Sequence, residues 1–171
     1  FDTVFDTSFS ADLTVIEEAN ELLYKLKNGE QKYPLGNSLP LFTSCCPAWV
    51  RFVETKYPEL LPYVSTCKSP MEMFGAVLKE YYKPADEEAG METVSVAVMP
   101  CVAKKHEAAR EEFKRNEVPD VDYVITTKEL ILMIKELGIQ FDEIEPSAPD
   151  MPFSINSGAG VIFGVTGGVM E

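Results

Sequence analysis

The sequence predicts an α/β protein in which a mostly parallel, four-stranded sheet is flanked by helices in a three-layer arrangement. Two observations lead to this prediction. Short runs of apolar and β-branched residues alternate along the chain with longer segments whose apolar residues recur every three or four positions. The segments between successive runs are long enough to hold a crossover helix, which parallel strands need.

Each predicted element follows from its own local pattern. The strands are short runs rich in apolar residues, and the third of them, ETVSVAVMP, has the strongest β pattern. The stretch from residue 141 to residue 160 is rich in Pro, Asp and Ser and is typical of a loop. The predicted strands span residues 4–9, 38–44, 92–100 and 121–127, and the predicted helices span residues 10–29, 47–53, 68–82, 102–115 and 128–138.

Capping residues mark the ends of several predicted helices. Ser10 is placed to cap the first helix, and Gly29 is placed to end it. Pro47 suits the first turn of the second helix, because proline lacks the N–H that a first turn leaves unpaired. Ser69 is expected to open the third helix and Thr127 the last one.

The composition is that of an ordinary globular domain with a strongly acidic balance. The 171 residues carry 15 basic and 28 acidic side chains, a net charge of −13. Phosphate binding needs clustered Lys and Arg, so this balance argues against nucleic acid and anionic membranes as partners. No apolar run approaches the roughly 20 residues that cross a bilayer. We expect a single partial domain, residues 1–171, truncated at both ends, because the chain does not begin with Met and ends inside a helical pattern.

Three of the four cysteines follow predicted strands. Cys45 and Cys46 come directly after the second strand, and Cys101 comes after the third. Ligands of open α/β sheets gather at the carboxyl ends of strands, so these thiols are expected to face one crevice. On pattern alone, a ligand role is about as probable as a plain buried thiol, whereas Cys67 is interpreted as a small apolar residue. The spacing does not resemble a disulfide framework, which favours a reducing, cytoplasmic location.

Charged residues near these cysteines have two possible interpretations. Lys104 lies one helical turn after Cys101 and could hold an anionic ligand, although a solvated lysine is the commoner case. Glu18 and Glu21 share one helix face and could pass protons if partly buried, or could form an exposed acidic face. His106, the only histidine, is expected at the surface.

Five ordered blocks of sequence resemble the catalytic domain of [FeFe]-hydrogenases. The resemblance covers nearly the whole chain and implies one lobe of that domain. The blocks read FDTSFSADLTVIEEANEL, TSCCPAWV, STCKSPMEMFG, MPCVAKKHEAAR and SGAGVIFGVTGGVME.

The resemblance implies an H-cluster, a [4Fe–4S] cluster joined through a cysteine to a two-iron unit that carries CO and cyanide. Cys46 and Cys101 resemble two of the cluster ligands, and Cys45 resembles the thiol that passes protons to the two-iron unit. Lys104 resembles the lysine that hydrogen-bonds a cyanide. The remaining implied site residues are Glu18, Ser65 and Glu21 on the proton path, and Ser69, Met99, Pro100, Phe163 and Gly164 near the cofactor.

The resemblance also implies what this chain lacks. A [4Fe–4S] cluster needs four ligands, and the family's third cysteine motif is absent, so the chain alone is expected to be apo and inactive. Lys25 replaces a common arginine at the outer end of the proton path, as a surface cation. Met71 replaces a common glutamine.

Partners and alternatives follow from the same resemblance. The implied substrates are H₂ and protons. The implied partners are ferredoxin or NAD(P)-linked electron-transfer subunits and the proteins that assemble the H-cluster. The alternative function is that of a related iron–sulfur assembly protein or an H₂ sensor without rapid turnover. The retained proton path and Lys104 favour the enzyme.

Overall fold

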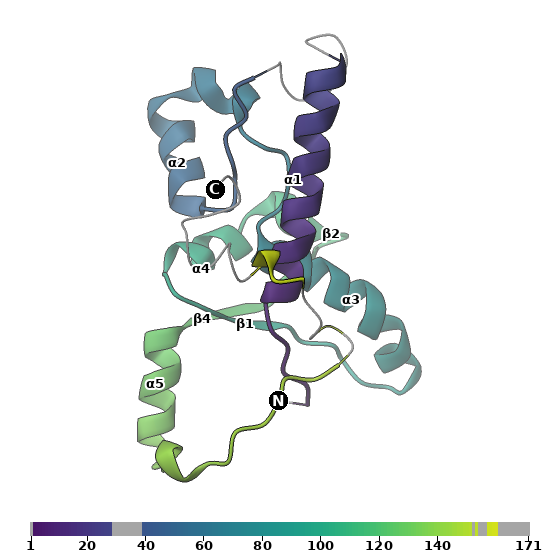
Figure 1. Cartoon of the computed structure of the whole chain (residues 1–171). Coiled ribbons are helices and arrows are strands. Elements are labelled where there is room, and N and C mark those ends of the chain that lie inside the picture. Colours follow the sequence, from purple (N-terminus) through teal and green to yellow (C-terminus); the bar gives the residue numbers. More distant parts are fainter. Residues whose placement is uncertain (1, 29–38, 152, 154–156, 161–171) are drawn as a thin grey trace.

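Two long helices pack against each other along one side of the molecule. The computed structural model describes residues 2–28, 39–151, 153 and 157–160. Helix α1 (Ser8–Asn28) contacts helix α3 (Pro70–Glu88), and Figure 1 shows α1 upright with α3 running away from its lower half. Aromatic rings fill the joint between them, since Phe9 and Phe74 lie with ring centroids 5.9 Å apart. Phe153 adds a third ring, 5.2 Å from Phe9.

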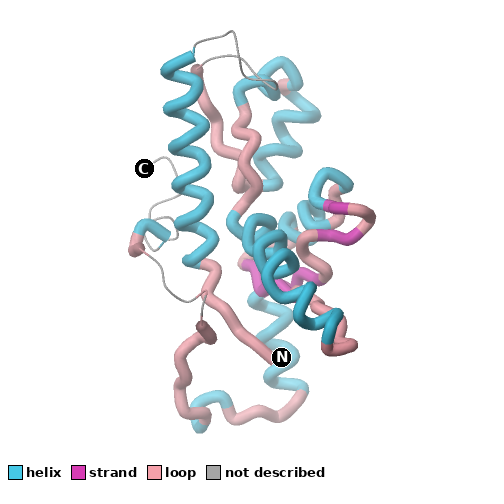
Figure 2. Tube along the Cα trace, turned by 90° about the vertical axis from the view of Figure 1, so that its right-hand side faces the viewer, coloured by secondary structure: helices cyan, strands magenta, loops and turns pink. Residues whose placement is uncertain are grey.

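The parallel sheet consists of two strands in the part of the chain that the structure describes. Strand β1 (Val96–Met99) pairs in parallel with strand β4 (Tyr123–Thr126), and Val96 lies opposite Tyr123. The α/β class with a parallel sheet is therefore confirmed, but the sheet is narrower than the predicted four strands. Figure 2 shows that strands occupy only a small part of a chain made mostly of helices and loops.

Helices lie on both sides of this small sheet. Helix α4 (Ala103–Ala108) contacts β4, and helix α5 (Thr127–Glu136) contacts both β4 and β1. Figure 1 shows α4 above the strands and α5 below them, which agrees with the predicted layering. The remaining helical elements are α2 (Pro47–Lys56) and the short 3₁₀ turns η2 (Pro58–Tyr63), η3 (Glu111–Phe113) and η4 (Phe141–Glu143).

A small apolar core joins the sheet to helix α3. Met71, Met99 and Val121 are buried together, with Ala97 and Val124 of the two strands packed against them. The helix approaches very closely at Gly75, where an added Cβ would overlap the backbone of Asp120. An ion pair of 2.7 Å between Lys79 and Asp122 adds a polar contact at the same junction.

The N-terminal strand prediction is wrong. Residues 4–6 form no strand, and helix α1 begins at Ser8. The Asp6 carboxylate accepts a hydrogen bond from the Ser8 amide at 2.8 Å, as capping side chains do. Ser10, the predicted cap, lies inside the first turn, where its hydroxyl donates to the Thr7 carbonyl at 2.9 Å. The capping side chain, Asp6, thus lies four residues before the predicted one.

Two other predicted elements are shorter than expected. Of the strand predicted at 38–44, the described residues 39–44 form a single bridge, between Phe42 and Val64. The helix predicted to reach residue 115 ends at Ala108, and the antiparallel strands β2 (Lys114–Arg115) and β3 (Val118–Pro119) follow it. These strands are joined through Asn116 and Glu117, which both have positive φ angles, 50° and 66°.

Most of the predicted helix starts are confirmed. Ser69 is the N-cap of α3, and Pro47 begins α2, which continues three residues beyond the predicted Val53. The last helix is capped by Thr126, one residue before the predicted Thr127. Its hydroxyl accepts from the Glu129 amide while the Glu129 carboxylate accepts in return.

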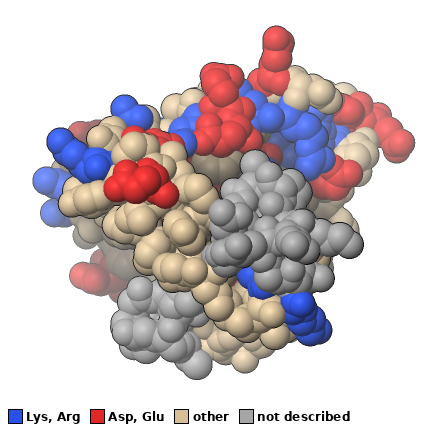
Figure 3. Space-filling view, turned by 90° about the horizontal axis from the view of Figure 1, so that it is seen from above, with Lys and Arg blue, Asp and Glu red and all other residues tan. Residues whose placement is uncertain are grey.

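Basic and acidic side chains lie next to one another on the surface. Figure 3 shows Lys and Arg side chains lying beside Asp and Glu side chains on the face seen from above. Where the chain is described, no helix combines the length and apolar character needed to cross a membrane.

Candidate active site

The adjacent cysteines lie at the start of helix α2 and occupy different environments. Cys46 is the N-cap residue, with extended backbone angles, and its carbonyl accepts from the Val50 amide at 3.1 Å. Its side chain is exposed, whereas Cys45 is half-buried. One thiol therefore faces outward and its neighbour faces the protein, as two different roles would require.

Lys104 links the segment that bears Cys101 to the turn that bears Cys45 and Cys46. Cys101 is exposed and lies just after β1, two residues before α4. Lys104 of α4 donates a hydrogen bond from Nζ to the Cys45 carbonyl oxygen at 2.9 Å. The same ammonium pairs with Glu107 Oε2 at 2.7 Å. The start of α4 is thus tied to the turn that bears Cys45 and Cys46.

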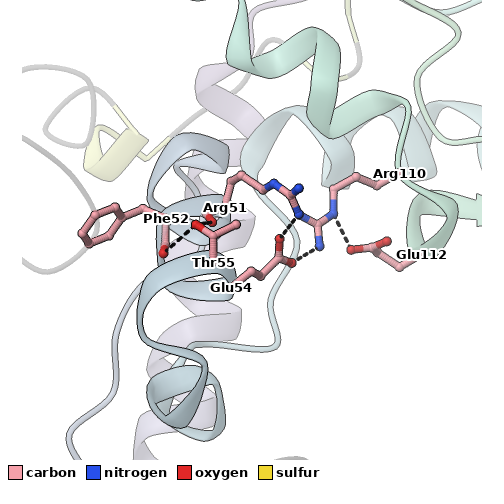
Figure 4. Close-up of polar contacts among 6 residues, drawn as sticks. All are labelled: Arg51, Phe52, Glu54, Thr55, Arg110 and Glu112. Atoms are coloured by element: carbon pink, nitrogen blue, oxygen red, sulfur yellow. Dashed lines mark hydrogen bonds and ion pairs between the residues drawn. The ribbon is translucent and has the colours of Figure 1, made fainter.

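An ion-pair cluster joins the far ends of the two cysteine-bearing regions. Figure 4 shows the Glu54 carboxylate of α2 between the guanidinium groups of Arg51 and Arg110, and Glu112 on the other side of Arg110. The hydrogen bond from Arg110 is the main reason that the pKa of Glu54 is lowered. Because Arg110 follows α4, this cluster holds α4 against α2.

Glu21 lies in a polar network at the edge of the site. Its Oε2 accepts from the Ser65 hydroxyl at 2.7 Å, and the Thr66 amide lies 3.3 Å from the same oxygen. Its Oε1 pairs with Lys25 Nζ at 3.1 Å. The prediction that Lys25 is a surface cation is wrong, because Lys25 is only 4% exposed. Burial beside a carboxylate provides the partner that a buried ammonium needs.

Glu18 is buried deeper than Glu21. It is 2% exposed, and neither carboxylate oxygen has a hydrogen-bond partner among the described residues. Burial raises the pKa of Glu18, and the nearby Ser65 hydroxyl and Ser44 amide only partly oppose this. Burial also raises the pKa of the Cys45 thiol, and the negative charge of Glu18 adds to the rise. Glu18 is therefore close enough to Cys45 and Ser65 to act on both electrostatically.

The other predicted site residues differ in burial and in location. Met99 is buried in the apolar core, and Pro100 is exposed at the end of β1. Ser69 is buried at the start of α3, where its hydroxyl accepts from the backbone. Phe163 and Gly164 lie outside the described residues. His106 is exposed, as predicted.

Sequence reasoning missed the buried carboxyl group of Glu72. Glu72 is completely buried, and both of its carboxylate oxygens have no partner among the described residues. Burial raises its pKa to about 8, and the charges of Glu107 and Asp120 contribute to the rise. The spacing Ser69-x-x-Glu72 resembles a capping box, which would have explained Glu72 as a local helix residue. The Ser69 half of that box forms, and the Glu72 half does not.

The residues present fit part of an iron–sulfur site. Cys46 and Cys101 offer exposed thiols on two segments that Lys104 ties together, and thiolates are the ligands such clusters take. Within the described ranges, no group of three or more potential metal ligands occurs together. The described part of the chain therefore has exposed thiols, of the chemical kind that such a cluster binds, on two adjoining segments.

The family model described as the C-terminal domain of the iron-only hydrogenase large subunit matches residues 1–171. The chain belongs to this iron-only hydrogenase family. It is 48% identical to the NADP-reducing hydrogenase subunit HndD of Solidesulfovibrio fructosivorans, over 100% of this chain and 29% of that protein.

A solved hydrogenase structure has the same fold as this chain. An apo variant of the [FeFe]-hydrogenase HydA1 from Chlamydomonas reinhardtii superposes with a TM-score of 0.80 and 46% identity, covering 99% of this chain and 42% of that one. A more distant relative is the cytosolic Fe-S cluster assembly factor narfl of Xenopus tropicalis, 33% identical over 88% of this chain and 32% of that protein. The chain thus spans less than half the length of these proteins.

Proposed function

We propose that the whole protein containing this domain catalyses the reversible conversion of protons and electrons into H₂ at an H-cluster. The observation that carries the proposal is the succession of polar groups between Lys25 and Cys45. Glu21 accepts from Ser65 at 2.7 Å, and Ser65 and Cys45 both lie within electrostatic reach of the buried Glu18. A carrier of iron–sulfur clusters has no need for such a series.

The chain's own residues can carry a proton along this series in three transfers. Glu21 passes a proton to the Ser65 hydroxyl, the hydroxyl passes one to Glu18, and Glu18 passes one to Cys45. Burial raises the pKa of Glu18, so this carboxyl holds a proton more readily than an ordinary glutamate does and can take part in proton transfer. The Cys45 thiol is only half-buried, so it can pass the proton on from the end of the series.

Cys46 and Cys101 are proposed to hold the [4Fe–4S] part of the cluster. The cluster and its two-iron unit would supply electrons and an open iron site for hydrogen chemistry, while the protein orients its surroundings. Lys104 has three N–H donors, and contacts among the described residues use two of them. Its third donor suits an anionic ligand such as cyanide. Ser69, Met99 and Pro100, with Phe163 and Gly164, are proposed to surround the cofactor.

The alternative function is that of an iron–sulfur assembly protein or an H₂ sensor, and the narfl relative is the reason to keep it. Substitution of Cys45 separates the alternatives. In the whole protein with its cofactor, Cys45→Ala is expected to abolish H₂ turnover while iron and acid-labile sulfide stay at wild-type levels. Full turnover in Cys45→Ala would remove Cys45 from the mechanism. Wild-type protein that binds iron but makes no H₂ would favour assembly or sensing.

Cys46→Ala is the matched control for this experiment. It removes the neighbouring thiol, which is proposed to bind iron, so it should lower the iron content itself. A Cys46→Ala protein with full iron content would contradict the proposed division of labour between the two cysteines.

The isolated chain is proposed to be inactive, because it provides two of four cluster ligands. Iron and acid-labile sulfide assays of the purified chain test this, and near-stoichiometric four-iron content would contradict it. We further propose ferredoxin or an NAD(P)-linked subunit as the electron partner and a cytoplasmic location. The name of the HndD relative supports the NAD(P)-linked choice.

A further inference from the structure

We propose that Cys67 is a positioning residue of the proton relay, whose backbone directs the Ser65 hydroxyl and whose thiol holds the Glu21 carboxylate. The inference rests on the proposed function. It gives a role to a cysteine that the sequence pattern assigned to the core. Cys67 is only partly buried, and it contacts two members of the relay, Ser65 with its amide and Glu21 with its side chain.

The backbone of Cys67 links the relay to the segment that carries the catalytic thiol. The Cys67 amide donates to Ser65 Oγ at 3.1 Å. Because that oxygen already accepts from the amide, the Ser65 O–H can point at Glu21 Oε2, 2.7 Å away. The Cys67 carbonyl accepts a hydrogen bond from the Ser44 hydroxyl at 2.7 Å. Ser44 directly precedes Cys45 in the chain.

The side chain of Cys67 acts on the carboxylate itself. Its Sγ lies 3.7 Å from Glu21 Oε2, the same oxygen that accepts from Ser65. The other oxygen, Oε1, pairs with Lys25 at 3.1 Å. Donors on both oxygens restrict rotation of the carboxylate, so Oε2 stays directed at Ser65.

The thiol is suited to remain a donor. Burial raises the pKa of Cys67 to about 11, and the nearby charges of Glu21 and Glu18 contribute. At neutral pH the group is therefore an S–H, which can donate to a carboxylate but does not compete with the relay for protons. A thiol is also a weak donor, so it orients Glu21 without holding it as tightly as an ammonium would.

Cys67 also lies where the relay approaches solvent. An open hollow of about 410 Å³ is lined by Glu21, Cys67 and Asn20, among others. Among the residues of the proposed relay, Glu21 is the one that lines this hollow. The orientation of Glu21 should therefore influence the rate at which protons reach Ser65.

The test compares Cys67→Ala and Cys67→Ser in the whole protein loaded with its cofactor. We expect Cys67→Ala to lower the H₂ evolution rate by about 3- to 10-fold, a fraction of what a proton-transfer group contributes, and to increase the solvent isotope effect in D₂O. Cys67→Ser keeps a donor and should recover the rate to within about twofold of wild type. Iron content and the infrared bands of the CO and cyanide ligands should be unchanged in both variants.

Asn20→Ala provides the matched control. It alters the same hollow without touching the network described above, so its rate and isotope effect should equal those of wild type. An equal loss in Asn20→Ala would overturn the inference, because the hollow and not the thiol would then be responsible.

Three further results would overturn the positioning role. The first is a wild-type rate and isotope effect in Cys67→Ala, and the second is a Cys67→Ser protein as slow as Cys67→Ala. Loss of the infrared bands in Cys67→Ala would also overturn it, because the residue would then support the cofactor. A wild-type protein without H₂ turnover would refute the proposed function and this inference together, whereas the other results refute the inference alone.

Discussion

The Nζ atom of Lys104 lies 2.9 Å from the backbone carbonyl oxygen of Cys45, 59 residues earlier in the chain. A charged donor on a carbonyl makes a stronger contact than a neutral one. The same ammonium pairs with Glu107, so one side chain is the partner of both a backbone carbonyl and a buried carboxylate. This contact brings the segment after β1 to the turn that bears the paired cysteines.

Removing Lys104 should destabilise the folded chain. Lys104→Met leaves the Glu107 carboxylate, 4% exposed, without its ammonium partner, so we expect the free energy of unfolding to fall by about 3 kcal/mol. Urea unfolding followed by circular dichroism measures this loss. The double variant Lys104→Met, Glu107→Gln removes the buried charge as well and should regain more than half of it. A single variant as stable as wild type would mean that the pair contributes nothing.

Glu72 should make stability depend on pH. Its pKa rises from an ordinary value of 4.5 to about 8 in the folded chain, mainly through burial. Between these values the folded state holds a proton that the unfolded state has released, so the free energy of unfolding falls as pH rises through this window. Lys104 and Lys68, which face Glu72 together with Glu107 and Asp120, moderate the fall.

The variant Glu72→Gln isolates this contribution. Relative to wild type it should gain on the order of 2 to 4 kcal/mol of stability between pH 5 and pH 9, because the amide does not ionise. Urea midpoints of both proteins across this range give the difference. A constant difference at every pH would show that Glu72 keeps one protonation state throughout.

The four cysteines should react with iodoacetamide in a defined order. Cys46 and Cys101 are exposed and should be alkylated first. Burial raises the pKa of Cys45, so it should react more slowly. Cys67, with its pKa raised to about 11, is a thiolate in roughly one molecule per thousand at pH 8 and should react last. Mass spectrometry of timed samples tests the order, and rapid labelling of Cys67 would contradict it.

The Glu54–Arg110 pair should couple helix α2 to the segment after α4. Both side chains are about one-fifth exposed, so the pair is only partly screened by water. A double-mutant cycle with Glu54→Gln and Arg110→Gln is expected to give a coupling free energy of about 1 to 2 kcal/mol. Arg51, more exposed and 3.4 Å from Glu54, offers the comparison, because its cycle with Glu54 should give less than half as much. Equal values for both cycles would contradict this ranking.

Features set by neighbouring residues were predicted well. Ser69 and Pro47 begin their helices as expected, and strands form within both valine-rich runs, because capping and β patterns depend on a few adjacent residues. The first strand was mispredicted, because an apolar run next to a helix start does not reveal whether it will find a strand partner. Phe42 likewise needs a partner strand from elsewhere in the chain. The segment beside it pairs with it only at Val64.

The sequence by itself determined the family and the starts of α2 and α3, since these depend on residue type and order. It also marked Cys45, Cys46 and Cys101 as candidates for a chemical role. Only the tertiary structure decided which of these groups are buried and which touch. Lys25, expected in solvent, is enclosed beside Glu21, and Cys67, expected in the core, contacts the same carboxylate. Burial and distance arise when segments far apart in the chain pack together, and that packing sets whether a side chain keeps its charge.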